Sequence, residues 1–444
     1  MEVLLAGLAA LTPVSGPAPA QPPNCPAGQI CAVHLSAEQL FYLAEQLAER
    51  GAMDHAVEIL KTLSRDPRPD FRAEARVRIA RLLQARGDRE GALYWFRQLL
   101  DERPDAAAVR IELAALLKQM GQPKAAVREL RRAEAAGLPK DAARIVRNAA
   151  SVLQDNAPLS ASLSVGVAPD TNINSATTAR TVDIFGLPFA LSRDGRATSG
   201  IGLTFNGQVV NRMHIDPSIR LITEANASGN LYRSGSFNDV VLSADSGPEL
   251  PVGHSRVRPA VQIGTRFFGQ PRLYNFYGVS LGSLSPVGIK GQVELTASVV
   301  DFVYNAERRD QSGPSYSIGF AYDRVLSPRL SVRLGTNLSR VSARDSQYSS
   351  VAYTVDLLCS RDFPGLTVFA RGVFTALNGD SDFSFFEKPR RDRVYSIDSG
   401  VTFRNVRLLG LSPSIRMSYT HSSSVIDLYR FHRLRFEASL EKAF

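Results

Sequence analysis

Residues 292–300 read QVELTASVV, and apolar and polar side chains alternate along nearly all of this stretch. On an extended backbone, side chains with this period point to opposite faces of a sheet. The segments 256–266 (RVRPAVQIGTR) and 330–338 (LSVRLGTNL) repeat the pattern. In the first stretch we expect an apolar face of Val293, Leu295, Ala297 and Val299 and a polar face of Gln292, Glu294, Thr296 and Ser298. Such strands suit either a solvated sheet or the wall of a water-filled transmembrane barrel.

Fourteen segments of this kind follow one another after residue 157. We expect strands near 159–168, 199–211, 218–231, 239–247, 255–268, 273–284, 289–304, 315–326, 330–343, 348–361, 366–377, 394–406, 411–423 and 431–444. Outer-membrane barrels use an even number of strands, each crossing the bilayer with about ten residues. The sequence therefore predicts an antiparallel transmembrane β-barrel of about 14 strands over residues 158–444. A soluble β-sandwich is the alternative, although closure removes the edges that a large open sheet exposes.

The segment before the strands has a different composition. Residues 36–156 are rich in Ala, Leu, Arg and Glu, and their apolar positions recur at helical spacing. Three segments repeat one pattern: LAEQLAERGAMDHAVEILKTLSRDP, IARLLQARGDREGALYWFRQLLDERP and LAALLKQMGQPKAAVRELRRAEAAGLP. Gly51, Gly87 and Gly121 mark the same point in each segment, 36 and then 34 residues apart. A period near 34 with two short helices per unit is typical of tetratricopeptide repeats. We predict such a solenoid over 36–156, with a plain helical bundle as the alternative.

A repeat solenoid has a concave face, which the first helix of each repeat lines. The repeat register places seven side chains on that face: Phe41, Glu45, Val77, Arg81, Gln84, Ile111 and Lys118. We predict that this groove binds a protein client, whereas the plainer interpretation is a solvated helical surface. Residues 140–154 are expected to form a helix that closes the stack.

The N-terminus has the composition of an exported protein. Residues 1–20 combine a short apolar core with a small-residue cleavage site, Ala18-Pro19-Ala20, and predict a signal peptide. Residues 21–35 are then a linker, in which Cys25 and Cys31 are close enough in sequence to form a small loop in an oxidising compartment. The chain carries 52 Lys and Arg against 43 Asp and Glu. Because no basic run of nucleic-acid type occurs, we expect a solvated basic surface and no nucleic-acid partner.

The phrase VGVAPDTNINSAT (165–177) ends the first expected strand. Its centre is the hexapeptide Pro169, Asp170, Thr171, Asn172, Ile173 and Asn174. Asp and Asn side chains bond nearby backbone and tolerate left-handed conformations, so the hexapeptide is suited to a rigid turn without glycine. A gate or a client contact inside the barrel is the alternative interpretation.

A short repeat stack, a C-terminal barrel and this hexapeptide together resemble the surface lipoprotein assembly modifier (Slam) family, over about residues 36–444. The hexapeptide is similar to the family's Pro-(Asp/Asn)-(Ser/Thr)-Asn-(Val/Ile)-Asn signature, and residues 429–444 (YRFHRLRFEASLEKAF) are similar to its closing segment. The resemblance implies an outer-membrane translocator that moves lipoproteins or related secreted proteins to the cell surface, with its repeat domain in the periplasm. It further implies that the terminal Phe444 is the signal by which the barrel-assembly machinery accepts the chain.

The partners expected from the resemblance are a protein client, alone or with a periplasmic chaperone, the barrel-assembly machinery and outer-membrane lipid, and we expect a monomer. An exopolysaccharide exporter and a passive porin with a repeat-domain scaffold are the alternatives. Neither a cofactor nor an enzymatic activity is expected. The nearest catalytic candidates are His421 and Ser422, and we place His421 on the lipid face. The run GDSD at 379–382 suits a solvated acidic loop better than a calcium site.

Overall fold

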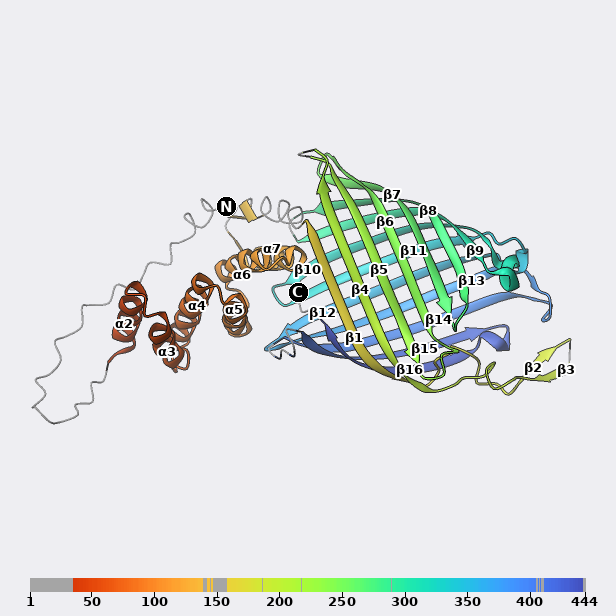
Figure 1. Ribbon diagram of the computed structural model, residues 1–444, viewed down its shortest axis with the longest axis horizontal. Coiled ribbons are helices and arrows are strands. Elements are labelled where there is room, and N and C mark those ends of the chain that lie inside the picture. The colour runs from red at the N-terminus through yellow and green to blue at the C-terminus, as the bar shows by residue number, and fades with distance from the viewer. Residues whose placement is uncertain are drawn as a thin grey trace, which may run out of the picture. The chain divides into compact units, whose positions relative to one another are not determined.

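The computed structural model describes residues 35–138, 142–143, 145–146, 158–185, 187–216, 218–288, 290–404, 406, 408 and 411–441 (Figure 1). The chain divides into two compact units, Met1–Gln154 and Asp155–Phe444. The predicted signal peptide, Cys25, Cys31 and Phe444 lie outside the described residues.

The first unit is helical. Its helices with assigned bounds are α2 (Ala37–Glu49), α3 (Met53–Leu63), α4 (Pro69–Arg86), α5 (Arg89–Glu102), α6 (Ala107–Gln119) and α7 (Pro123–Ala135). Each contacts the next along the chain, and their apolar faces form two buried clusters. None of the helices among the described residues has both the length and the apolarity to cross a bilayer.

The turns within the helix pairs recur at the predicted positions. Gly87 ends α4 in a left-handed conformation, with φ of +90°, which a residue with a Cβ adopts only at a cost. Gly51 and Gly121 take the same place after α2 and α6, with φ of +80° and +74°. In the second helix of each pair, the small side chains of Ala56, Ala92 and Ala126 are fully buried. These helix pairs follow the predicted period, and their assignment as tetratricopeptide repeats stays a prediction.

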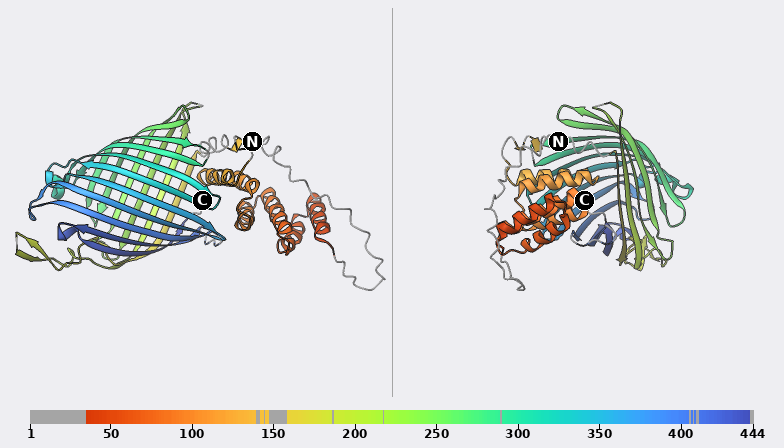
Figure 2. Two further views of the ribbon diagram at one scale, coloured as in Figure 1. Left: turned by 180° about the vertical axis from the view of Figure 1, so that it is seen from behind. Right: turned by 60° about the vertical axis from the view of Figure 1, so that its left-hand side comes forward.

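The second unit is a closed antiparallel barrel, which confirms the predicted architecture of 14 strands. In order around the wall, its strands are β1 (Leu159–Asp170), β16 (Phe431–Glu441), β15 (Ser412–Ser424), β14 (Lys388–Phe403), β13 (Leu366–Phe383), β12 (Ser350–Phe363), β11 (Leu330–Val341), β10 (Gly313–Ser327), β9 (Gly291–Tyr304), β8 (Arg272–Val287), β7 (Ser255–Phe268), β6 (Asp239–Val252), β5 (Arg220–Tyr232) and β4 (Gly200–His214). Figure 2 shows this wall from behind. A hairpin of β2 (Thr181–Ile184) and β3 (Leu187–Ala190) projects from the long connection between β1 and β4.

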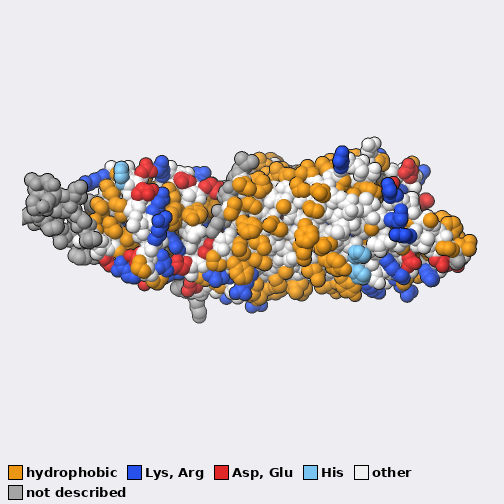
Figure 3. Space-filling view, turned by 90° about the horizontal axis from the view of Figure 1, so that it is seen from below, with side chains coloured by type: hydrophobic (Ala, Val, Ile, Leu, Met, Phe, Trp, Pro, Cys, Tyr) orange, Lys and Arg blue, Asp and Glu red, His pale blue; other side chains and the backbone are white. Residues whose placement is uncertain are grey.

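The two faces of the wall differ as the alternating pattern predicts. Leu295 and Val299 of β9 point outward and are 50% and 43% exposed, whereas Glu294 and Ser298 point into the lumen. Apolar side chains cover much of the outer surface of the barrel (Figure 3). A largely apolar exterior on a closed sheet is the arrangement that a bilayer stabilises.

The barrel has two distinct ends. β1 begins and β16 ends at one of them, here called the base end, where short connections at 253–254, 328–329 and 364–365 join strands. Most of the longer connections lie at the opposite loop end, including 171–199, 305–312 and 342–349.

Candidate functional site

The seam between β1 and β16, where the barrel closes, has the sparsest backbone pairing in the wall. Among the described residues, the register joins Ser164–Val167 to Ala438–Glu441 and then Asp170 to Arg435, which makes five pairs. Every other neighbouring pair of barrel strands has at least eleven. Pro169 lies in the gap and has no N–H to donate. The loop-end half of the seam therefore needs other contacts.

An ion pair supplies the first of these contacts. The side chain of Asp170 is fully buried, and its Oδ2 accepts bonds from Arg433 Nε at 2.9 Å and Nη2 at 2.5 Å. Its Oδ1 accepts the backbone N–H of Asn172 at 2.9 Å. A carboxylate that is both ion-paired and hydrogen-bonded tolerates burial. Asp170 therefore connects the first strand to the last through side chains.

Thr171 and Asn172 continue the connection. The Thr171 N–H donates to the Leu434 carbonyl at 3.0 Å, and the Leu434 N–H donates to Thr171 Oγ1 at 2.9 Å. Asn172 Nδ2 donates to the His432 carbonyl at 3.2 Å. We call this set, Asp170, Thr171 and Asn172 against His432, Arg433 and Leu434, the closing clasp. Its side chains take over the role of backbone pairing where the ladder stops.

The end of the hexapeptide joins the two arms of the long connection. Asn174 Nδ2 donates to the carbonyls of Asp194 and Arg196, at 3.0 and 2.7 Å, and its Oδ1 accepts the N–H of Thr198 at 3.1 Å. One amide thus holds the outgoing and returning arms of residues 171–199 together. The chain turns here, with the Ser175 N–H donating to the Asn172 carbonyl at 3.2 Å, and the hexapeptide also carries long-range contacts that local sequence chemistry did not reveal.

The lumen wall is polar, and many of its charges are paired with opposite charges. Arg333 of β11 donates to Glu294 at 2.9 Å and to Asp323 at 2.6 Å. The same arrangement recurs around the wall in the pairs Arg220–Glu249, Arg258–Asp245, Arg266–Asp239, Arg371–Asp356 and Arg435–Glu437. Hydroxyl groups pair across strands as well, in Ser298–Ser317, Thr354–Thr375 and Ser396–Thr420. The wall therefore presents many weak polar contacts, in which charges of both signs stand next to each other.

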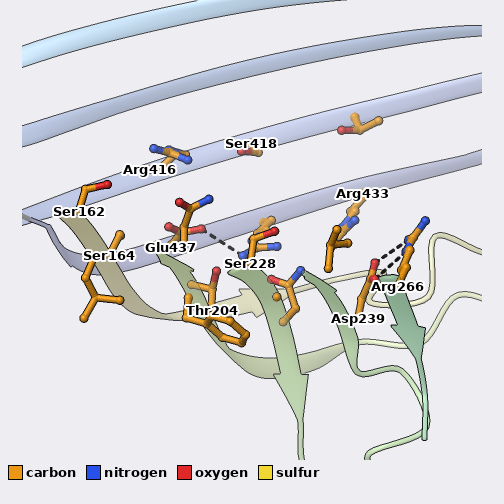
Figure 4. Close-up of a pocket in the computed structure, with 18 residues that line it drawn as sticks. Ser162, Ser164, Thr204, Ser228, Asp239, Arg266, Arg416, Ser418, Arg433 and Glu437 are labelled. Atoms are coloured by element: carbon orange, nitrogen blue, oxygen red, sulfur yellow. Dashed lines mark hydrogen bonds and ion pairs between the residues drawn. The ribbon is translucent and has the colours of Figure 1, made fainter. Parts of the chain in front are cut away.

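Part of the lumen beside the seam forms a cavity of about 670 Å³ (Figure 4). Strands from both sides of the seam contribute to it, including Ser162 and Ser164 of β1 and Ser418 of β15. Arg433 of the closing clasp reaches the cavity from β16. The Arg416 guanidinium, also in the lining, lies over the Phe369 ring at 5.4 Å from its centroid. The clasp is thus within reach of whatever occupies the lumen.

The seven predicted groove residues of the helical unit divide into two groups. Phe41 and Val77 are buried in the core, 7% and 5% exposed, so little of either is available to a partner. Phe41 stacks on Phe71 of α4, with the ring centroids 5.9 Å apart. The others lie at or near the surface: Glu45, Arg81, Gln84, Ile111 and Lys118. Client binding by this face stays a prediction.

Polar contacts connect the first helices of successive pairs. Arg81 of α4 donates to Glu112 of α6 at 2.7 Å, and Gln84 donates to Gln119 at 3.2 Å. Arg78 of α4 lies 3.5 Å from Glu45 of α2. Sequence reasoning missed Arg78 and Glu112, although their separations from their partners are close to the repeat period.

The catalytic candidates do not form a site. Ser422 is on the lumen face, and its hydroxyl donates to the Tyr429 carbonyl at 2.8 Å. His421 is exposed on the outer face, as predicted. Asp380 of the GDSD run pairs with Arg340. Within the part of the chain that the structure describes, no three His, Cys, Asp or Glu side chains gather as metal ligands would.

Comparisons with known proteins give one family and several remote structures. A family model described as surface lipoprotein assembly modifier matches residues 160–444. Similar solved structures are Acinetobacter baumannii OccAB3 (10% identity, 64% of this chain and 98% of that chain, TM-score 0.36), the Acinetobacter baumannii outer membrane channel DcaP (6%, 64% and 96%, 0.38) and a bacterial polysaccharide outer membrane secretin (10%, 64% and 98%, 0.31). No curated protein matches.

Proposed function

The chain belongs to the surface lipoprotein assembly modifier family and is an outer-membrane β-barrel protein, and from this premise we propose that it moves a protein client from the periplasm to the cell surface. The client is a surface lipoprotein or a related secreted protein. In this proposal the helical unit collects the client on the periplasmic side, and the barrel passes it outward. Folding of the client at the surface, or its binding to a partner there, supplies the driving force.

The observation that carries this proposal is the paired charge of the lumen wall. A polypeptide in transit presents side chains of both charge signs, and a wall dominated by one sign would retain some of them and repel others. Ion pairs such as Arg266 with Asp239 and Arg258 with Asp245 instead place both signs side by side along the wall. An exporter of a uniformly charged polysaccharide favours a wall of one sign instead, so this observation favours a protein client.

The closing clasp has a defined part in the proposal. A client inside the lumen presses on a wall whose seam has little backbone pairing near the loop end. The buried Asp170–Arg433 pair keeps β1 and β16 together there. We therefore assign the hexapeptide to closure of the barrel during passage.

The test of the function compares cells that lack the gene with the same cells complemented by the wild-type gene. In both strains, protease added outside intact cells reports which lipoproteins are exposed at the surface. Candidate lipoproteins are expected to become protease-resistant on deletion and susceptible again on complementation. If every candidate stays exposed at the surface without the gene, and reconstituted barrels conduct small solutes freely, a passive porin is the better description.

A lumen variant sharpens the test. Asp239→Asn, Asp245→Asn and Glu294→Gln together leave arginines in excess on the wall. We expect slower surface exposure of the client with normal barrel assembly. Asp301→Asn removes one carboxylate from the outer face instead and is the matched control. Equal export by both variants would argue against passage along the charged wall.

A further inference from the structure

Basic side chains gather on the outer face of β14–β16, towards the loop end of the barrel. Tyr395 of β14 points outward and is 51% exposed, so the alternation along this strand also turns Arg391 and Arg393 outward. On the next two strands, His421 and His432 lie opposite each other in the register, and both are exposed on the same face. Figure 3 shows His side chains with Lys or Arg side chains nearby on this surface. We call the two arginines and two histidines the basic band.

No carboxylate neutralises the arginines of the basic band. Among the described residues, neither has an Asp or Glu within ion-pair distance, and the outward positions of β14, β15 and β16 hold no acidic side chain. Arg393 donates only to uncharged acceptors, Asn378 Oδ1 at 3.3 Å and the Asp392 carbonyl at 2.9 Å. Asp380 of β13 is already paired with Arg340 of β11. The described protein therefore leaves the positive charge of the band without a counter-charge.

Aromatic side chains place the basic band at the level of lipid head groups. Tyr and Trp are enriched where a membrane protein passes from the acyl chains to the head groups. On the outer face, the Phe374 and Tyr395 ring centroids are 5.0 Å apart, and Tyr419 of β15 is 42% exposed beside them. Arg393 and Arg391 follow Tyr395 towards the loop end, roughly 7 and 14 Å along the strand. The arginines therefore lie beyond the acyl chains, where head groups are.

The wall on the base-end side of this aromatic row suits acyl chains. Its outward side chains are apolar and are 41–60% exposed: Ile397 of β14, Ile415 and Met417 of β15, and Phe436 of β16. A molecule that contacts both this wall and the basic band needs acyl chains at one end and an anionic group at the other.

We propose that the basic band binds the phosphorylated head group of the outer-leaflet glycolipid, lipid A, whose acyl chains lie on the apolar wall of β14–β16. A guanidinium binds phosphate through two parallel N–H bonds, and the imidazoles of His421 and His432 offer further donors beside it. The helical unit precedes β1, which begins at the base end, and the proposed function places that unit in the periplasm. The loop end then faces the outer leaflet. The inference rests on this orientation but not on the client, and purified protein tests it separately from transport.

The test is native mass spectrometry of the full chain, purified in mild detergent and supplied with lipid A that carries two phosphates. Wild type is expected to retain the lipid. Arg391→Gln with Arg393→Gln should bind it at least roughly tenfold more weakly, because charge-assisted bonds to phosphate are lost. Arg308→Gln with Arg309→Gln is the matched control, which removes two exposed arginines from η1 (Ala306–Gln311) at the loop end. Loss of lipid from both double variants, or from neither, overturns the proposal.

The role of the phosphates has its own measurement. Wild type should retain the phosphorylated lipid A in preference to its dephosphorylated form, and Arg391→Gln with Arg393→Gln should lose this preference. Equal retention of the two forms by wild type overturns the role of the phosphates. In a mixture of equal amounts, lipid A should also displace phosphatidylglycerol from wild type. Equal retention of these two lipids would show a general attraction for anionic lipid and would overturn the assignment to lipid A.

Other occupants give distinct results. Lipid A should raise the temperature of heat modification for wild type and the Arg308/Arg309 control but not for the Arg391/Arg393 variant. Equal shifts in all three would contradict a site at the band. The same rise with inorganic phosphate alone would show an anion site that needs no lipid. If the Arg391/Arg393 variant keeps lipid A but exposes less client at the cell surface, the band contacts a protein and the lipid assignment is wrong.

Discussion

Leucine occupies opposite environments in the two units of this chain. Leu116 of α6 is fully buried in the helical unit, whereas Leu295 of β9 is 50% exposed on the outer wall of the barrel. The helical unit gains stability by removing apolar surface from water. The barrel has no such core, since its lumen is polar and its apolar side chains face lipid. Its stability must therefore come from strand pairing and from the contacts that close the wall.

The closing clasp is where this difference has its largest expected effect. Asp170→Ala leaves the Arg433 guanidinium without its carboxylate at the seam, and breaking a buried pair in this way costs roughly 3–5 kcal/mol. The barrel should then lose its heat-modifiable folded form at a lower temperature in electrophoresis. Asp183→Ala in the exposed β2–β3 hairpin is the control and should leave that temperature unchanged. An Asp170→Ala barrel as heat-stable as wild type would show that backbone pairing alone closes the wall.

Truncation of one leucine in each unit tests the comparison directly. Leu116→Ala opens a cavity in the helical core and should destabilise that unit by about 2–5 kcal/mol. Leu295→Ala exchanges one lipid-facing side chain for another and should cost less than about 1 kcal/mol. Trp95, the sole tryptophan of the chain, packs beside the helical core, so its fluorescence in denaturant reports the helical unit. Comparable losses in both units would refute the account of where apolar surface matters.

Acid should also affect the two units differently, because the helical unit contains a buried carboxylate whose ionised form stabilises the fold. Burial by itself would raise the pKa of Glu129, but Arg132 and Arg110 outweigh it and lower that pKa to about 2. A depressed pKa stabilises the folded state above the unfolded value of 4.5, and this contribution disappears as the pH falls from there towards 2. The loss amounts to roughly 3 kcal/mol.

The measurement is the stability of the helical unit against pH, again from Trp95 fluorescence. Glu129→Gln should be less stable than wild type at pH 7 and should lack the extra acid sensitivity. A wild-type curve that is flat between pH 5 and pH 2.5 would contradict the assigned role of Glu129.

The exposed pairs between helices should matter least for stability. Arg81→Ala removes the bond to Glu112, and because about half of the Arg81 side chain is exposed, the cost should stay below about 1 kcal/mol. If Arg81→Ala nevertheless reduces surface exposure of a client, the face of α4 and α6 takes part in client binding. Arg103→Ala, which breaks the exposed pair with Asp70, is the matched control.

The alternating pattern was sufficient to predict the barrel, because a period of two assigns each side chain to a face without knowledge of its neighbours. It correctly placed His421 on the outer face and the fourteen strands in sequence. The helical groove was harder. Phe41 and Val77 fall in the predicted register, but contacts from other helices bury them, and sequence spacing does not report such contacts.

The clasp escaped prediction for a related reason. Asp170 and Arg433 are 263 residues apart in the chain, and only closure of the barrel brings them together. The hexapeptide was noticed as a turn, yet its role at the seam depends on a strand at the other end of the domain.

The amide of Asn174 also has a practical consequence. Because it fastens both arms of the 171–199 connection, the β2–β3 hairpin extends from a fixed point on that connection. Phe185 and Leu187 at its tip are each 61% exposed. An epitope inserted at this tip should leave barrel assembly intact. Antibody labelling of whole cells would then report which end of the barrel faces the medium, and so the orientation of every strand.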